Sequence, residues 1–210
     1  MPLTVVPAAQ PTRRCHPYGA IVPTTTSEVL VIGAGVHGAS AAYHLAHRGI
    51  TTTVLEKGYA AGGPTGRSSA VVRAYYTNEF LARVARDAIE IFEAFEELTG
   101  GDCSYRRTGA LWMHSAEDEV AARTSAAALN ALGIACDLVP GDSVRAEHPR
   151  FAADDVAVGV WEHGAGYADP VGTTTGLLER AVALGATYRR GVTVAKVEET
   201  PTSVRVTSDA

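Results

Sequence analysis

The stretch Val29-Leu30-Val31-Ile32-Gly33-Ala34-Gly35-Val36-His37-Gly38 decides the fold. Four apolar residues that stop at a glycine are too few for a helix, so residues 29–32 predict a strand buried on both faces. Residues 36–48 are rich in alanine and are followed by Gly49, which predicts a helix with a glycine at its end. The β-branched run at 51–55 predicts a second strand. Together these segments predict a strand–helix–strand unit with parallel strands.

Gly33, Gly35 and Gly38 have the G-x-G-x-x-G spacing between that strand and that helix. Gly33 permits the tight turn, Gly35 lets the backbone approach a pyrophosphate, and Gly38 lets the helix pack closely on the strand. The pyrophosphate is expected on the unpaired N–H groups at the helix N-terminus, beginning at Val36. The side chain of His37 is expected beside the cofactor, without a role in proton transfer.

Glu56 stands at the end of the second strand, 23 residues after Gly33, and Lys57 follows it. A carboxylate at this position accepts hydrogen bonds from ribose hydroxyls and repels a 2′-phosphate, which disfavours an NADP-type cofactor. The unit therefore predicts a site for the ADP half of a dinucleotide, and by itself it leaves NAD and FAD both open.

The rest of the chain alternates helices and strands. The best helix candidate is residues 78–98, where apolar residues recur at three- and four-residue steps before Gly100. Residues 60–69 are rich in glycine, proline, threonine and serine and predict a loop. The further predicted helices are 116–132 and 170–184, and the further predicted strands are 108–114, 134–139, 156–161 and short strands within 187–207 with a turn near Pro201.

Two stretches resemble one family. Residues 62–73, Gly-Gly-Pro-Thr-Gly-Arg-Ser-Ser-Ala-Val-Val-Arg, are similar to the flavin-contacting loop of the D-amino-acid oxidase superfamily, in its sarcosine oxidase, glycine oxidase and dimethylglycine dehydrogenase branch. Residues 166–170, Gly-Tyr-Ala-Asp-Pro, and the segment 185–194 follow in the order that this family shows. The resemblance implies an α/β fold: a Rossmann-like FAD-binding domain with a parallel sheet, plus part of an α+β substrate domain.

The resemblance implies FAD as the cofactor and assigns further residues to it. Gly66, Ser68 and Ser69 are small, as a close approach of the flavin ring to the backbone requires. Arg67 is a candidate for the flavin phosphates or a nearby carboxylate. Val194 matches the valine whose backbone amide and carbonyl lie against the adenine.

Arg73 is the candidate catalytic residue. It matches an arginine that faces the substrate carboxylate in sarcosine-oxidase-like members, where a guanidinium grips a carboxylate through two hydrogen bonds. The alternative is an arginine in a surface or structural ion pair. The implied reaction is oxidation of the C–N bond of a secondary or tertiary amino acid or amine, with hydride transfer to the flavin.

The resemblance also implies a division into segments. Residues 1–27, with five prolines and the run Thr24-Thr25-Thr26, are expected to be a flexible extension. Residues 28–99 would form the first FAD-binding segment, 100–165 a partial substrate domain, and 166–210 an incomplete return to the FAD-binding domain. Family members are roughly twice as long, so the chain is interpreted as a truncated product, as one part of a split enzyme completed by a second polypeptide, or as a protein that retains only the ADP site.

Composition excludes several other classes. The net charge of −5 gives no reason to expect nucleic acid as a partner. No run approaches the ~18 apolar residues of a membrane span. Three scattered cysteines and seven histidines without ligand spacing argue against a disulfide framework or a metal site, and they fit a reducing cytoplasm. A non-catalytic FAD-binding subunit and an NAD-dependent dehydrogenase remain the alternatives to an FAD-dependent oxidoreductase.

Overall fold

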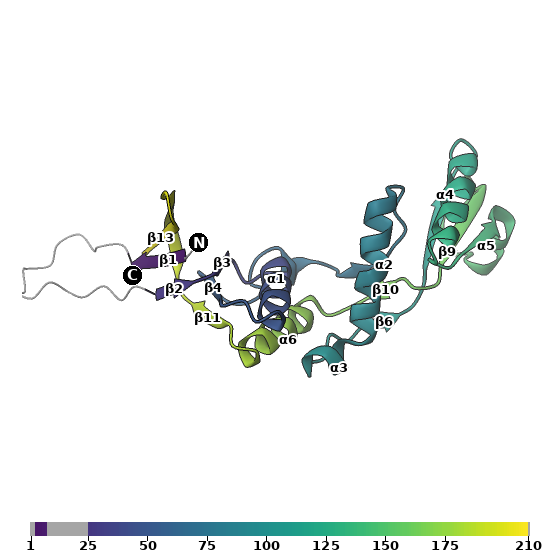
Figure 1. The fold of residues 1–210 in the computed structure, drawn as a ribbon. Coiled ribbons are helices and arrows are strands. Elements are labelled where there is room, and N and C mark those ends of the chain that lie inside the picture. Colours follow the sequence, from purple (N-terminus) through teal and green to yellow (C-terminus); the bar gives the residue numbers. More distant parts are fainter. Residues whose placement is uncertain (1–2, 8–24, 210) are drawn as a thin grey trace, which may run out of the picture. The chain divides into compact units, whose positions relative to one another are not determined.

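The computed structural model describes residues 3–7 and 25–209, and these form two compact units (Figure 1). Within the described residues, unit 1 contains those up to Ser68, the short segment Thr99–Cys103 and those from Pro170 onward. Unit 2 contains Ser69–Leu98 and Ser104–Asp169. Each unit has its own sheets and helices, and each is described separately.

Unit 1 contains the predicted parallel sheet. Its strand order is β11-β4-β3, and both pairings are parallel. The strands and the two helices beside them are β3 (Val29–Ile32), α1 (Val36–His47), β4 (Thr52–Glu56), α6 (Pro170–Ala183) and β11 (Thr187–Arg190). Helices α1 and α6 pack against each other. The predicted βαβ unit is confirmed, with boundaries that shift by at most one residue.

The burial of β3 differs from the prediction. Its residues are half-buried or exposed rather than buried on both faces, and the side chain of Ile32 is 54 % exposed. The physical reason is the strand order: β3 stands at the edge of this sheet and pairs only with β4. By contrast, Val54 and Leu55 in the central strand β4 are almost fully buried.

A second sheet of unit 1 has the order β12-β13-β1-β2. Its strands are β1 (Leu3–Pro7), β2 (Thr25–Ser27), β12 (Thr193–Glu199) and β13 (Val204–Asp209). Strand β1 runs parallel to β13 and covers one of its edges. The prediction of a flexible extension over 1–27 is therefore wrong for 3–7 and 25–27, since the β-branched residues there complete backbone pairing with β13 and with each other. The rest of that extension lies outside the described residues.

Unit 2 is built on two three-stranded antiparallel sheets, β7-β9-β8 and β5-β10-β6. The strands are β5 (Val71–Val72), β6 (Arg106–Arg107), β7 (Ala110–His114), β8 (Cys136–Pro140), β9 (Val158–Glu162) and β10 (Gly166–Tyr167). The helices are α2 (Glu79–Glu93), α3 (Phe95–Thr99), α4 (Glu119–Ala131) and α5 (Gly141–Glu147), and the short 3-10 helix η1 (Thr65–Arg67) precedes this unit.

Helix α2 belongs to the core of unit 2. Its residues Ala82 and Ile89 are buried in one cluster with Leu129 of α4 and Val160 of β9. The sequence grouped residues 69–98 with the FAD-binding segment, whereas this apolar packing places them with 104–169. The functional roles of the segments remain a proposal.

The helix predicted over 78–98 begins as expected and ends early. The Asn78 side chain accepts a hydrogen bond from the Leu81 N–H at 3.0 Å, which caps the first turn. Ala94 interrupts the helix, and α3 follows.

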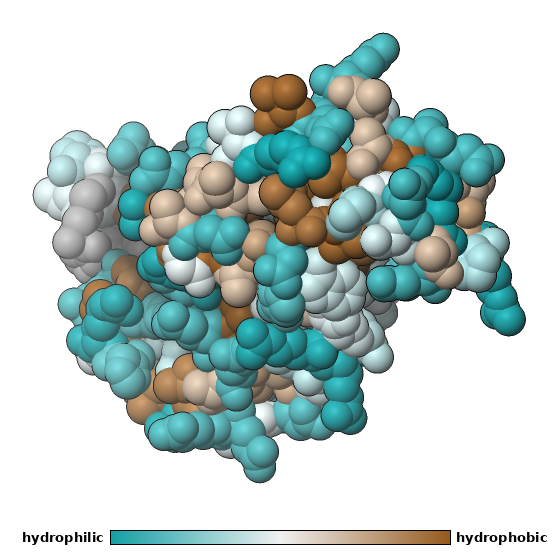
Figure 2. All heavy atoms as spheres, turned by 90° about the vertical axis from the view of Figure 1, so that its right-hand side faces the viewer, coloured by the Kyte–Doolittle hydropathy of each residue, from teal (hydrophilic) through white to brown (hydrophobic). Residues whose placement is uncertain are grey.

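Figure 2 shows apolar surface lying among polar side chains, and α2 contributes exposed apolar residues at Phe80, Leu81 and Val84.

Candidate functional site

The turn between β3 and α1 has the geometry that the glycine motif predicts. Gly33 has φ +100°, a value that favours glycine, and its N–H donates to the Leu55 carbonyl at 2.8 Å. A Cβ on Gly38 would lie 2.0 Å from the Gly33 carbonyl oxygen, so any side chain there would separate helix from strand. The motif therefore holds the start of α1 tightly against the end of β3.

The N-terminus of α1 is suited to an anion. Gly35 is the N-cap residue and has no side chain that could cap the helix, and the first turn contains no acidic residue. The backbone N–H groups and the positive end of the helix dipole therefore favour a phosphate group at this position. Half-buried Val36 and exposed His37 occupy the first two helical positions.

Thr65 of η1 lies on this helix N-terminus and was not singled out from the sequence. Its Oγ1 accepts a hydrogen bond from the Val36 N–H at 3.2 Å, and a Cβ on Gly35 would lie 3.0 Å from the same oxygen. Thr65 thus satisfies one of the N–H groups that a pyrophosphate would use. Only its position in a loop with small and hydroxyl residues could have indicated this contact.

Glu56 lies at the end of β4 beside the glycine motif. One of its carboxylate oxygens accepts the Ala34 N–H at 2.8 Å, and the other accepts the Gly58 N–H at 2.7 Å. Because each carboxylate oxygen has more than one lone pair, these contacts leave room for ribose hydroxyls as additional donors. Burial, and then the charge of Glu56, raise the pKa of Tyr188 in the neighbouring strand β11.

The loop after Glu56 is fixed to the glycine motif by backbone hydrogen bonds. Ala61 has φ +58°, its N–H donates to the Ala34 carbonyl, and its own carbonyl accepts the Gly66 N–H, both at 2.9 Å. A Cβ on Gly66 would lie 2.4 Å from the Ala61 carbonyl oxygen, so glycine is required for this turn. The other predicted cofactor residues of the region are exposed: Lys57, Arg67, Ser68 and Ser69.

The chain between β11 and β12 returns to the same edge of the sheet. The Val192 N–H donates to the Glu56 carbonyl at 2.9 Å, and Arg190 Nε donates to the Gly58 carbonyl at 2.9 Å. Val194 pairs with Ser208 of β13, and the register shifts directly after it, between Val194 and Lys196. Unit 1 therefore brings the glycine motif, Glu56, Gly66 and the start of β12 into one region, while their role as FAD ligands stays a prediction.

Arg73 lies in unit 2, and its guanidinium lies between two aromatic rings. Its Cζ is 4.6 Å from the centre of the Tyr76 ring and 4.9 Å from that of Trp112. Its Nη1 donates to the Tyr75 carbonyl at 3.3 Å. Among the described residues, no carboxylate forms an ion pair with it, in contrast to the alternative of a structural salt-bridge arginine.

Aromatic and polar groups extend this cluster. The Tyr75 ring stacks on Trp112 at 5.4 Å between ring centres, and its hydroxyl lies 3.2 Å from His114 Nε2. Glu162 is fully buried and accepts hydrogen bonds from the Ala74 N–H and from Trp112 Nε1. Burial, together with the charges of Cys136 and Glu162, raises the pKa of Tyr75.

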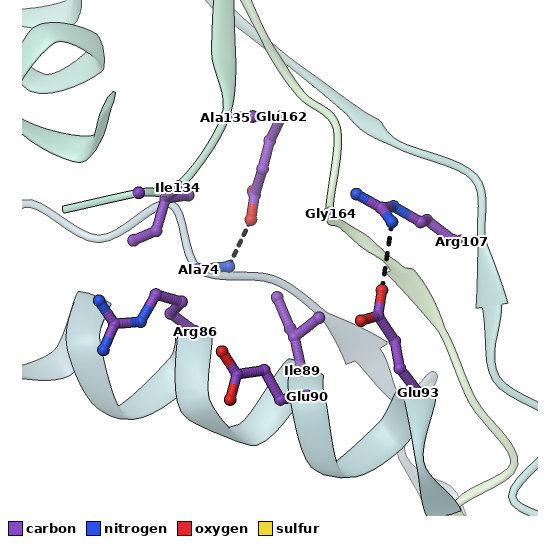
Figure 3. Close-up of a pocket in the computed structure, with 11 residues that line it drawn as sticks. Ala74, Arg86, Ile89, Glu90, Glu93, Arg107, Ile134, Ala135, Glu162 and Gly164 are labelled. Carbon is purple, nitrogen blue, oxygen red and sulfur yellow. Dashed lines mark hydrogen bonds and ion pairs between the residues drawn. The ribbon is translucent and has the colours of Figure 1, made fainter. Parts of the chain in front are cut away.

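A small pocket of about 150 Å³ lies beside this cluster in unit 2 (Figure 3). Glu162 and Ala74 form one wall, and Ile89, Glu90 and Glu93 of α2 form another. Figure 3 shows Glu162 pointing to the Ala74 N–H, away from the ion pair between Arg107 and Glu93.

Residues 3–7 and 25–209 contain no group of three or more histidine, cysteine, aspartate or glutamate side chains able to hold a metal ion. In the same residues, none of the helices is both long enough and apolar enough to span a membrane.

Comparison with known proteins assigns the family. Residues 28–210 match the family described as DAO, FAD dependent oxidoreductase. The chain belongs to this family of FAD-dependent oxidoreductases.

Individual relatives agree with this assignment. Mitochondrial dimethylglycine dehydrogenase from Rattus norvegicus is 24 % identical over 182 residues, which cover 83 % of this chain and 21 % of the relative. Sarcosine oxidase subunit beta from an Arthrobacter species is 33 % identical over 91 residues, covering 42 % of this chain and 22 % of the relative.

Among solved structures, L-proline dehydrogenase from P. horikoshii superposes with a TM-score of 0.74 at 27 % identity, over 86 % of this chain and 50 % of that chain. The chain thus spans about a fifth of the length of the two curated relatives and half of the solved one.

Proposed function

We propose that this chain binds FAD and contributes to the oxidation of the C–N bond of a small secondary or tertiary amino acid or amine. Gly33, Gly35 and Gly38 would hold the pyrophosphate at the N-terminus of α1, and Glu56 would hold the ribose. When bound, FAD supplies the acceptor for the hydride removed from the carbon next to nitrogen. The first turn of α1, which follows a glycine N-cap and contains no acidic residue, fits this anion.

The substrate class in this proposal is argued from the surroundings of Arg73. A guanidinium between two rings, with one carbonyl as its hydrogen-bond acceptor, keeps its charge uncompensated by any carboxylate among the described residues. Such a cation is suited to a carboxylate brought by a ligand, which it would orient through two hydrogen bonds. The names of the relatives, a dimethylglycine dehydrogenase and a sarcosine oxidase subunit, support an N-methyl amino acid as the substrate class.

Spectroscopy tests this function. Purified protein is expected to carry flavin absorption, and N-methylglycine added without oxygen is expected to bleach it. Arg73→Lys keeps the positive charge and loses the planar guanidinium that can donate two parallel hydrogen bonds to a carboxylate. The concentration of N-methylglycine that bleaches half of the flavin should therefore rise by roughly 10- to 100-fold. The matched control is Arg83→Lys, since Arg83 is an exposed residue of α2 paired with Glu79. Protein that stays colourless after incubation with FAD, or that binds NADH instead, would contradict the proposal.

A second candidate function is a cofactor-binding subunit that turns over only with a second polypeptide. The edge strand β3 favours it, because Ile32 is 54 % exposed and the outer edge of β3 has no partner strand among the described residues. The name of one relative, a sarcosine oxidase subunit beta, agrees with an assembly. This candidate predicts flavin retention without bleaching by the isolated chain, and turnover by the isolated chain would exclude it.

A further inference from the structure

Glu162, the last residue of β9, is fully buried and accepts hydrogen bonds from two residues beside Arg73, Ala74 and Trp112. One carboxylate oxygen accepts the N–H of Ala74, the residue that follows Arg73, at 2.5 Å. The other accepts Trp112 Nε1 at 3.1 Å, and the Trp112 ring is one of the two rings that flank the guanidinium. One buried side chain is thereby connected to the backbone and to the ring that together locate Arg73.

An ion pair does not explain the burial of Glu162. Its exposed fraction is 0 %, and among residues 25–208 no lysine, arginine or histidine side chain lies within ion-pair distance of it. Burying a carboxyl group is costly unless hydrogen bonds compensate it, and here the compensation consists of the Ala74 N–H and the Trp112 indole N–H. An apolar residue in the same space would leave both of these N–H groups without this acceptor, so the carboxylate fixes Ala74 and Trp112 in addition to filling the space.

We propose that Glu162 is a positioning residue that holds Arg73 ready for a ligand carboxylate. This inference rests on the proposed function, in which Arg73 grips that carboxylate. The Ala74 contact fixes the backbone beside Arg73, and the Trp112 contact fixes the plane of the ring against the guanidinium. Arginine has many rotamers, so a guanidinium that is held before binding loses less conformational entropy when the ligand arrives.

Glu162→Gln tests the inference with little change in volume. The amide of glutamine offers one acceptor oxygen and one NH₂ donor, so it can accept only one of the two N–H groups and must face the other with a donor. Glu93→Gln is the matched control, because Glu93 lines the same pocket and pairs with Arg107 without touching Arg73. Trp112→Phe is the second variant, since it retains an aromatic ring, smaller than the indole, and removes the indole N–H that donates to Glu162.

The first measurement uses the protein without ligand. The exchange of the Arg73 Nε–H proton with solvent is followed by NMR of ¹⁵N-labelled protein, with the signal assigned by its loss in Arg73→Lys. Glu162→Gln and Trp112→Phe are each expected to speed this exchange at least about tenfold, which corresponds to ~1.4 kcal/mol. Glu93→Gln should leave it unchanged. Unchanged exchange in Glu162→Gln and Trp112→Phe, with both folded, would overturn the inference.

The second measurement separates this inference from the proposed function. N-methylglycine is titrated against the wild-type protein, Glu162→Gln and Glu93→Gln, and the indole signal of Trp112 reports binding. Glu162→Gln is expected to raise the dissociation constant for N-methylglycine about tenfold. Glu93→Gln is expected to leave it unchanged. If the wild-type protein binds no N-methylglycine, the proposed function fails, while the exchange of Arg73 Nε–H still decides whether Glu162 positions it. Equal affinity in wild type and Glu162→Gln would overturn the positioning role.

Discussion

The carboxylate of Glu56 connects two parts of the cofactor region through backbone donors. It accepts one N–H from the glycine motif, at Ala34, and one from the loop that follows it, at Gly58. A ribose that donates to the same oxygens would therefore meet a carboxylate that is already oriented. Thr65 likewise connects the loop after Glu56 to the N-terminus of α1, because its hydroxyl oxygen accepts the Val36 N–H.

Replacing Glu56 with glutamine should weaken FAD binding. The amide can accept from only one of Ala34 and Gly58, and it loses the negative charge that strengthens hydrogen bonds from ribose hydroxyls. We expect a dissociation constant for FAD at least about tenfold higher, measured by the quenching of flavin fluorescence on binding. Glu28→Gln is the control, because Glu28 also accepts a backbone N–H, from Thr51, and is exposed. Equal losses in the two variants would mean that Glu56 has only a structural role.

Cys136 provides a pH-dependent prediction. Burial, and then the charges of Glu162 and Asp137, raise the pKa of its thiol to about 11. In the unfolded chain a thiol ionises near its ordinary pKa of about 8.5. The neutral thiol therefore contributes stability that is fully present below about pH 8.5 and is lost as the pH rises toward about 11.

Urea unfolding at a series of pH values measures this effect. The free energy of unfolding of the wild-type protein should fall more steeply across that alkaline range than that of Cys136→Ala. The charge of Cys136 is also one cause of the raised pKa of Tyr75, so the difference between the two proteins contains the direct effect of the thiol and its effect on Tyr75, and both act in the same direction. Parallel curves for the two proteins would contradict the prediction.

At the scale of elements, the packing of α1 on β3 depends on one glycine. A methyl group on Gly38 would lie 2.0 Å from the Gly33 carbonyl oxygen and 3.3 Å from Val31 Cγ1. The first of these neighbours is backbone and cannot move without displacing the helix or the turn. Gly38→Ala should lower the free energy of unfolding by roughly 2–4 kcal/mol and weaken FAD binding.

A matched glycine in the same unit gives the control. A Cβ on Gly63 would have no atom within 4 Å, and Gly63 has no positive φ. Gly63→Ala should therefore be close to neutral in urea unfolding, within about 0.5 kcal/mol of the wild-type protein. If Gly38→Ala proves as stable as Gly63→Ala, the close packing of α1 on β3 is not required.

Elements with local signals were predictable from the sequence, and elements made by distant pairing were not. The glycine motif predicts β3, α1 and β4 because the turn at Gly33 and the close contact at Gly38 involve residues near each other in the chain. Strand β10, in contrast, has two residues, and it exists because Gly166 pairs with both Val72 and Arg107. Strand β1 likewise depends on pairing with β13 at the other end of the chain.

The same distinction applies to the site. The sequence identified Gly33, Gly35, Gly38 and Glu56, whose spacing is short and fixed by the backbone. It did not single out Thr65, which contacts Val36 across 29 residues, or Glu162, which contacts Trp112 across 50 residues. Those contacts depend on which loops and strands become neighbours after folding, and no periodicity or turn residue encodes that.

At the scale of the whole molecule, the two units make different contributions. Unit 1 contains the glycine motif, Glu56 and Val194, whereas unit 2 contains Arg73 and Glu162. Of the predicted FAD residues, only Ser69 falls in unit 2, at its first position. Cofactor binding should therefore stabilise unit 1 selectively, because a ligand stabilises the state that binds it by RT ln(1 + [L]/Kd).

Hydrogen–deuterium exchange tests this division. At FAD concentrations of about 100 times the dissociation constant, the gain is about 2.7 kcal/mol, or roughly a hundredfold slower exchange where opening releases the cofactor. We expect that slowing in β3, β4 and the first turn of α1, and little change in β7 and β9. Glu56→Gln should lose the effect in proportion to its weaker binding. Equal slowing in β7 and β9 would mean that the two units open together, and that the site cannot be assigned to unit 1 alone.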